Sequence, residues 1–210
     1  MKRRTLDIIF AGGGAVLAVL LLVLGFVLAD QASFAKDYVK DQLGQQKITF
    51  ATADKLTDED KNWKPGSTCL TEYAGKLMET GKQAECYANF YIGHHTYNSA
   101  KAAGYEGGTY ATIGTVQTDL RAQIADAKAK NDTAGAADLQ KKLDAATALR
   151  STLQTGETLR GLLLTSYGFS IFGEKAALAG NVCYMAGGLL ILLAIAGFVH
   201  AFVTPKDKAV

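Results

Sequence analysis

Two long uncharged stretches, one toward each end of the chain, set the first limit on how this sequence can fold. Residues 8–29 are 22 consecutive residues without a charge, and only Asn181 and His200 interrupt the apolar run of residues 176–203. A helix rises about 1.5 Å per residue, so each stretch can cross a hydrocarbon core of roughly 30 Å. The sequence therefore predicts an all-α membrane protein with two transmembrane helices, and it excludes a simple soluble domain.

A cleaved signal peptide is the alternative interpretation of the first stretch. Lys2, Arg3 and Arg4 form a basic start, and Val-Leu-Ala at residues 27–29 resembles a small-residue cleavage site. The apolar run is longer than the roughly 7–15 residues that are usual in a signal peptide. Its length favours a span that the mature protein keeps.

Basic residues predict the orientation of both spans in a cell membrane. Lys2, Arg3 and Arg4 precede the first span, and Lys206 and Lys208 follow the second. Cytoplasmic flanks carry an excess of Lys and Arg, so both termini are expected in the cytoplasm. Residues 1–7 and 204–210 would be short cytoplasmic tails, and residues 30–175 an extracytoplasmic helical domain.

The overall charge gives no sign of a polyanionic partner. The chain has a net charge of +2, and residues 30–175 contain 17 Lys and Arg against 18 Asp and Glu. A balance of this kind argues against nucleic acid as a ligand. The partners that we expect are lipid and other integral membrane protein subunits.

Each predicted span carries a line of small residues at steps of four and three. The first line is Ala11, Ala15, Ala18, Gly25 and Ala29, with Leu22 between them. The second is Ala176, Gly180, Cys183, Gly187, Ala194, Gly197 and Ala201, with Leu190 between them. Small residues let helix backbones approach closely, so these seams could pack on each other or on a different subunit. Gly187 and Gly197 are therefore candidate interaction residues.

The region between the spans predicts mostly helices joined by short turns. We expect a helical extension over 30–47, a short extended piece at 48–50, a helix start or a polar loop at 57–60, and a turn at 64–67. Helices are predicted over 70–78 and 83–100, separated by Gly81, and Gly104, Gly107 and Gly108 mark a flexible loop. Residues 112–131 and 139–153 carry apolar faces with a helical period and predict an antiparallel hairpin. The two faces consist of Ile113, Val116, Leu120 and Ile124, and of Leu139, Leu143, Ala146 and Leu153.

Residues 161–173 form a further uncharged segment of 13 residues, which is too short to cross a bilayer. Three interpretations are open: an interfacial helix, a buried helix of the external domain, or a contact for a neighbouring protein. Glu174 and Lys175 separate the segment from the second span. Its candidate interaction residues are Leu162, Leu163, Tyr167, Phe169 and Phe172.

Two of the three cysteines fall in the region that is predicted to be extracytoplasmic, where oxidation is allowed. A bridge between Cys69 and Cys86 is the prediction, and two free thiols or a metal pair are the alternatives. Cys183 lies inside the second span.

The histidines give no clear metal-binding pattern in the sequence. His94 and His95 are adjacent, so on a helix they point about 100° apart, and no spacing of two histidines and a carboxylate is evident. His200 is expected near the cytoplasmic headgroups. The chain carries no motif for a catalytic serine, a zinc protease, a phosphate loop or a dinucleotide. We therefore predict no cofactor, no metal and no enzymatic activity.

Several short motifs resemble a family of uncharacterised actinobacterial two-span membrane proteins. They are Val39-Lys40-Asp41-Gln42-Leu43, Gln46-Lys47-Ile48-Thr49-Phe50, the set Ala84, Ala88, Ile92 and His94 or His95, Gly108-Thr109-Tyr110, and Leu159-Arg160-Gly161-Leu162-Leu163-Leu164-Thr165-Ser166. The region around 112–153 departs from shorter relatives. Some relatives carry the label aromatic ring-opening dioxygenase, which would imply a non-haem iron held by two histidines and a carboxylate.

The leading hypothesis is a non-enzymatic accessory or structural subunit of a bacterial membrane assembly, with a respiratory-chain complex as its most specific form. The seams, the 161–173 segment and the helical external region motivate it. An independent envelope receptor or sensor is the second hypothesis, although tails of about seven residues leave little for signalling. The iron dioxygenase is the third.

Overall fold

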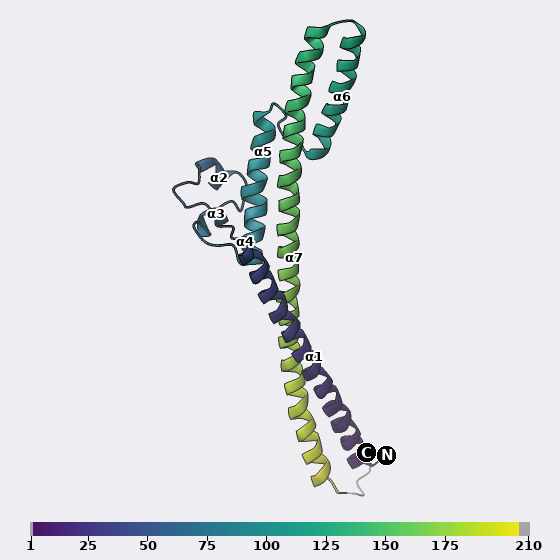
Figure 1. Ribbon diagram of the computed structural model, residues 1–210. Helices are drawn as coiled ribbons and strands as arrows, with labels where there is room; N and C mark the ends of the chain where they lie inside the picture. The colour runs from purple at the N-terminus through teal and green to yellow at the C-terminus, as the bar shows by residue number, and fades with distance from the viewer. Residues whose placement is uncertain (1, 206–210) are drawn as a thin grey trace. The chain divides into compact units, whose positions relative to one another are not determined.

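The structure, a computed structural model, describes residues 2–205, and within that range the protein is all-α (Figure 1). Lys206 and Lys208, on which part of the orientation argument rests, lie outside the described residues. The helices are α1 (Arg3–Gln45), α2 (Asp58–Asn62), α3 (Cys69–Glu72), α4 (Gly81–Cys86), the π-helix η1 (Tyr87–Ile92), α5 (Gly93–Ala102), α6 (Tyr110–Ala129) and α7 (Thr133–Val203).

The chain divides into two compact units, which we describe separately. The two-helix unit contains the described residues up to Val39 and those from Phe169 onward. The central unit is Lys40–Gly168. Helices α1 and α7 contribute to both units.

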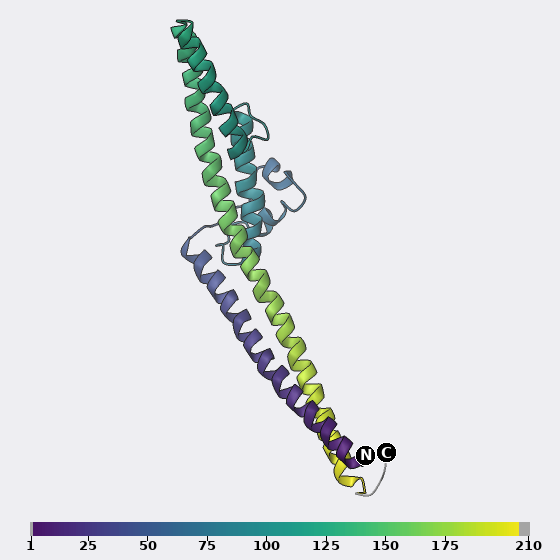
Figure 2. The ribbon, with the colours of Figure 1, turned by 90° about the vertical axis from the view of Figure 1, so that its right-hand side faces the viewer.

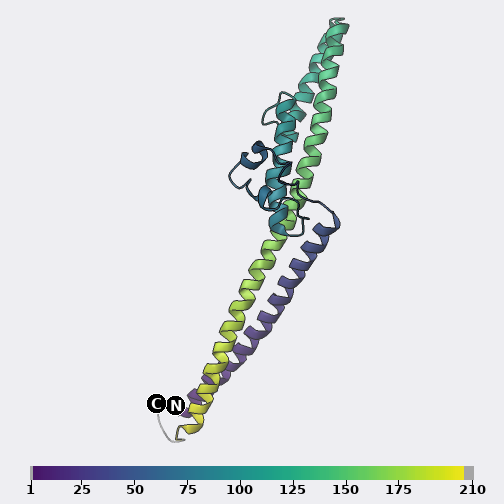
Figure 3. The ribbon, with the colours of Figure 1, turned by 90° about the vertical axis from the view of Figure 1, so that its left-hand side faces the viewer.

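The two-helix unit contains the apolar stretches that the sequence predicts to span a membrane. Helices α1 and α7 are the two helices among the described residues that are long and apolar enough to do so. Their paired parts lie alongside each other in all three views (Figures 1, 2 and 3). Large apolar side chains point outward from the pair, with Phe10 75 % and Phe202 72 % exposed. Such outward faces suit a lipid environment.

Helix α7 is longer than the sequence analysis predicts, because it joins three segments that were expected to be separate. Residues 139–153, 161–173 and 176–203 all lie in one helix of 71 residues. Between Thr133 and Val203 the sequence has no proline, the residue that breaks helices most strongly, and single glycines cost only about 1 kcal/mol each. The 161–173 segment is therefore not an independent helix.

The predicted extension of the first helix and the extended piece after it are both confirmed. Helix α1 continues to Gln45, and Thr49 then forms an isolated antiparallel bridge with Leu77. The backbone N–H of Met78 donates to the Ile48 carbonyl at 2.9 Å, and that of Phe50 to the Lys76 carbonyl at 3.0 Å.

The same bridge shows why the predicted helix over 70–78 is wrong. Helix α3 ends at Glu72, and Gly75 adopts a left-handed conformation with φ of +70°. This turn directs residues 76–78 to the extended piece, whose backbone groups take the place of helical partners. The bridge joins residues that are 28 positions apart, and a pairing over that distance leaves no local pattern in the sequence. The apolar residues of 70–78 therefore suggested a helix instead.

The helix predicted over 83–100 is present, but its start and its regularity differ. Gly81 does not separate two helices: it is the first residue of α4, which Thr80 caps. The Thr80 hydroxyl accepts from the Gln83 N–H at 3.2 Å, and Gln83 Oε1 accepts from the Thr80 N–H at 2.9 Å. This reciprocal pair is a capping box. The helix then passes through the π-helix η1 and continues as α5 to Ala102.

A shared apolar core joins α5, α6 and the first part of α7. Its buried residues are Ala100, Ile113, Leu120, Ile124, Leu143, Ala146, Leu149 and Leu153, with Val116 and Leu139 partly buried against them. All eight residues that the helical period assigned to the two apolar faces are thus in or against this core. Gln117 Nε2 donates to Thr147 Oγ1 at 2.8 Å, and Arg150 Nε donates to the Tyr110 carbonyl at 3.2 Å. Figure 1 shows α6 beside the start of α7.

Candidate functional site

The small-residue seams of the two-helix unit pack on each other. A Cβ atom on Gly180 would lie 3.1 Å from the Gly25 carbonyl oxygen, and one on Gly187 would lie 3.0 Å from the Leu22 side chain. A Cβ on Gly197 would lie 3.0 Å from Ala11 Cβ. The backbones therefore approach too closely for larger residues along much of the pair. Of the two partners that the sequence left open for these seams, the structure selects the seam of the same chain.

The candidate interaction residues of the 161–173 segment do not form one exposed face. Leu162 and Phe172 are 62 % and 76 % exposed, whereas Leu163 is buried at 6 %. Phe169 is 39 % exposed and lies edge-on to Tyr38, with ring centroids 5.8 Å apart. Tyr167 lies near the Lys82 ammonium, at 5.6 Å from the ring centroid. The segment thus combines inward and outward residues, as a continuous helix does.

The predicted disulfide between Cys69 and Cys86 is confirmed. It joins α3 to the last residue of α4, with the Cα atoms 6.1 Å apart. Cys183 is a free thiol in the apolar part of α7. A structural disulfide is typical of a compartment that is oxidising.

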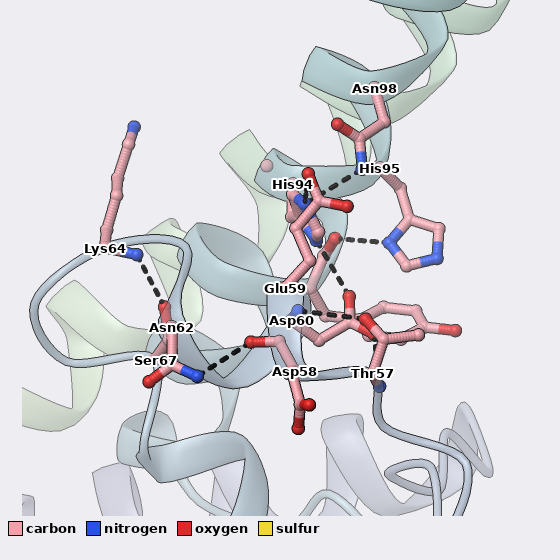
Figure 4. A network of polar contacts seen from close by, with 12 residues as sticks. Thr57, Asp58, Glu59, Asp60, Asn62, Lys64, Ser67, His94, His95 and Asn98 are labelled. Carbon is pink, nitrogen blue, oxygen red and sulfur yellow. Dashed lines mark hydrogen bonds and ion pairs between the residues drawn. The ribbon is translucent and has the colours of Figure 1, made fainter.

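A buried polar network around His94 is the densest arrangement of titratable groups that we find in the central unit (Figure 4). His94 is 2 % exposed, and its Nδ1 lies 2.8 Å from Asp60 Oδ1. On its other edge, Nε2 lies 2.9 Å from Asn98 Nδ2 and 3.5 Å from Glu59 Oε1. The Trp63 ring packs against the imidazole with centroids 5.1 Å apart.

Asp60 owes its position to the start of α2. Thr57 is the N-cap of this helix, and Asp60 Oδ2 accepts from the Thr57 N–H at 3.0 Å and from its hydroxyl at 2.7 Å. Of the two interpretations of residues 57–60, the helix start is therefore confirmed. Because the capping box uses Oδ2, the second carboxylate oxygen is free to face His94.

The electrostatics of Asp60 follow from this arrangement. Burial raises its pKa, but the hydrogen bonds from Thr57 and His94 outweigh burial, so the pKa is lower than the ordinary value. The carboxylate form is thus the one that the network stabilises. Tyr87 of η1 behaves differently, because burial, with a smaller contribution from Tyr91, raises its pKa to about 12.

His95 turns back toward the same network. Its Nδ1 donates to the Tyr91 carbonyl at 2.9 Å, and its ring lies 4.3 Å from the Tyr91 ring, centroid to centroid. Each of three residues, Asp60, His94 and His95, offers one donor atom. These three atoms lie within 4.8 Å of one another. The sequence analysis considered the two histidines but missed this grouping. Asp60 is 34 residues away from His94, and the Thr57-to-Asp60 capping pattern was the only sequence signal near it.

His200 also has a partner that the sequence analysis did not predict. Within the two-helix unit its Nδ1 lies 2.9 Å from Asp7 Oδ2. The pair joins the first turns of α1 to the last turn of α7. It fixes the ends of the two helices at the point where both apolar stretches stop.

Chemically, the central unit offers a buried carboxylate–imidazole pair with a second imidazole beside it, which is a set of donors for a proton or a cation. The two-helix unit offers apolar outward faces. Comparison of the chain with protein-family models, with curated proteins and with solved structures finds no match.

Proposed function

We propose that this protein is a non-enzymatic accessory subunit of a bacterial membrane protein complex, with a respiratory-chain assembly as the most specific form of the proposal. In this proposal α1 and α7 span the cell membrane, both termini lie in the cytoplasm, and the central unit lies outside. The disulfide in the central unit supports that orientation. The α6–α7 contacts support the antiparallel hairpin as part of the external domain.

The exposure of Leu162 is the observation that carries the proposal. Leu162 precedes Ala176, the residue of α7 at which the second apolar stretch begins. At about 1.5 Å per residue, the helix between these two residues is roughly 20 Å long. The headgroup layer on one side of a bilayer is only about 5–8 Å thick. Lipid therefore does not cover Leu162, although it is 62 % exposed, and Leu159 beside it is 45 % exposed.

The mutual packing of the seams supports the same proposal in a different way. Because the small residues are used within the chain, the two spans hold together without help from another subunit. A partner would then contact the bulky outward residues of the two spans and the exposed side of α7, which is the side that carries Leu159 and Leu162. The role is that of a self-contained pair of spans that presents an external domain to a larger assembly.

A matched pair of substitutions tests the proposal. Tagged full-length protein, purified in mild detergent, is expected to recover stoichiometric membrane subunits. Leu162→Asp should release these subunits while the central unit keeps its protease resistance, because the side chain is exposed. Leu163→Asp should instead unfold the unit, since Leu163 is buried.

Thr115→Asp is the control for added charge, because Thr115 is exposed in α6 and is not a neighbour of Leu162 on α7. It should retain the partners. Recovery of a lone monomer or homodimer from the wild-type chain would refute the accessory role. Retention of all partners by Leu162→Asp would show that this side of α7 is not the contact.

A further inference from the structure

We propose that Asp60, His94 and His95 form a binding site for a zinc ion in the central unit. This inference is independent of the accessory role, because none of the three residues belongs to the exposed side of α7. Two imidazoles and a carboxylate are a donor set that suits Zn²⁺ rather than Mg²⁺ or Ca²⁺, which prefer oxygen ligands. The three donor atoms already lie within 4.8 Å of one another.

The His94–Asp60 contact provides the starting point for the ion. His94 Nδ1 and Asp60 Oδ1 are 2.8 Å apart, the distance of a hydrogen bond from the ring N–H to the carboxylate. A zinc ion at this position replaces that proton. The bonds from zinc to nitrogen and oxygen are about 2.0–2.2 Å long, which places two ligands of a tetrahedral ion about 3.4 Å apart, so the two atoms need to separate by about 0.6 Å.

The surroundings of His94 supply the outer contacts that metal-binding histidines usually have. A histidine that binds through one ring nitrogen donates the other N–H to an oxygen, which fixes its orientation. Glu59 Oε1 lies 3.5 Å from His94 Nε2, and the Asn98 amide lies at 2.9 Å and can present its oxygen after a flip. Trp63 covers the ring and excludes water.

His94 and His95 both lie in α5, directly after the π-helix η1, so their approach to one ion depends on the conformation of the His95 side chain. On a regular α-helix their side chains point about 100° apart. Here His95 folds back along the helix onto Tyr91, the next-to-last residue of η1, through the hydrogen bond from Nδ1 and through ring stacking. To bind zinc the ring must present a nitrogen without a proton, which is either Nε2 or an Nδ1 that has left the Tyr91 carbonyl. Single π-turns occur often at functional sites. Because His95 is exposed, the fourth zinc position faces solvent and accepts water or a group from another molecule.

The experiment uses the full-length chain in detergent, with an affinity tag that contains no histidine. After treatment with a chelator, the protein is titrated with Zn²⁺ by calorimetry, and bound metal is counted by mass spectrometry. We expect one Zn²⁺ per chain and a higher melting temperature with zinc. Co²⁺ should give the visible absorption bands of a site with nitrogen and oxygen ligands.

His95→Ala is the main variant, because an exposed side chain can be removed without unfolding the unit. It should weaken Zn²⁺ binding about tenfold or more and abolish the zinc-dependent rise in melting temperature. His200→Gln is the matched control, since His200 belongs to the other unit, and it should bind as the wild type does. Asp60→Asn, checked for folding by circular dichroism, should also lose binding.

Three results would overturn the assignment. They are the absence of stoichiometric Zn²⁺ binding, equal affinity in wild type and His95→Ala, and binding of iron but not of zinc. Because the readouts are metal content and stability, they do not depend on which proteins co-purify. Failure of the zinc site would leave the accessory role intact, and the reverse also holds.

Discussion

At the scale of single residues, the disulfide between Cys69 and Cys86 holds together an irregular part of the central unit. The bridge spans a sequence separation of 17 residues, and the only helices in this stretch are the four residues of α3 and the six residues of α4. Loop closure of this length stabilises a fold by about 3 kcal/mol in the chain-entropy description.

Replacing either cysteine with serine should therefore destabilise the central unit by about 2–4 kcal/mol. Chemical unfolding of the purified protein measures the loss. Mass spectrometry without reduction should find Cys69 linked to Cys86 and should find Cys183 reduced. Recovery of both external cysteines as free thiols, under conditions that prevent reduction, would contradict the prediction.

Tyr87 gives the central unit a pH dependence on the alkaline side. Its ring lies edge-on to Phe50 at 5.2 Å and near Tyr91 at 4.6 Å, and burial raises its pKa to about 12. The unfolded chain loses this proton near pH 10. A group whose pKa is higher in the folded state stabilises the fold fully below the unfolded pKa and loses that contribution as pH rises toward the folded pKa.

Stability measured by urea unfolding should thus fall between about pH 10 and pH 12, and Tyr87→Phe should remove part of that slope. Absorbance at 295 nm should show one tyrosine that titrates well above the others. Equal slopes in the wild type and in Tyr87→Phe would show that this phenol does not contribute.

At the scale of elements, the helical period of apolar residues predicted helices well. It failed for segments whose hydrogen-bond partners are distant in the sequence. The apolar faces of 112–131 and 139–153 could be predicted because residues three and four apart share a face whatever lies elsewhere. The segment after Glu72 could not, because Gly75 turns it toward residues 48–50. The grouping of Asp60 with His94 was hidden for the same reason, since 34 residues separate them.

Close approach of α1 and α7 makes a prediction that distinguishes between two glycines of one helix. A Cβ on Gly180 would meet backbone atoms, the Gly25 oxygen at 3.1 Å and the Ala29 nitrogen at 3.4 Å, which cannot move aside as a side chain can. A Cβ on Gly188 would meet nothing within 4 Å. Both residues lie in the apolar part of α7.

Gly180→Leu should therefore lower the stability of the protein in detergent by about 1–3 kcal/mol, the usual cost of overpacking, whereas Gly188→Leu should leave it nearly unchanged. Thermal melting of the two variants in the same detergent makes the comparison. If both variants melted at the wild-type temperature, the seams would not be in contact in the membrane protein.

The two apolar helices limit the arrangement of the whole molecule. An even number of spans places the two termini on the same side of a membrane, and the intervening residues on the other side. Lys2, Arg3 and Arg4 favour the cytoplasm for the termini, and the Cys69–Cys86 bridge favours an oxidising compartment for the central unit. These two arguments depend on different residues and agree.

A reporter that works only in the cytoplasm should therefore be active when fused after Val210 and inactive when inserted near Gly135. A reporter that works only outside should give the opposite result, because Gly135 lies in the first turn of α7, within the central unit. Replacing Lys2, Arg3 and Arg4 with glutamine removes the N-terminal charge bias and should produce a mixture of orientations. Since Asp and Glu contribute little to this bias, replacement of Asp30 and Glu174 with glutamine is the matched control and should change nothing. An active cytoplasmic reporter near Gly135 would refute the orientation, and with it the extracytoplasmic placing of the disulfide and of Leu162.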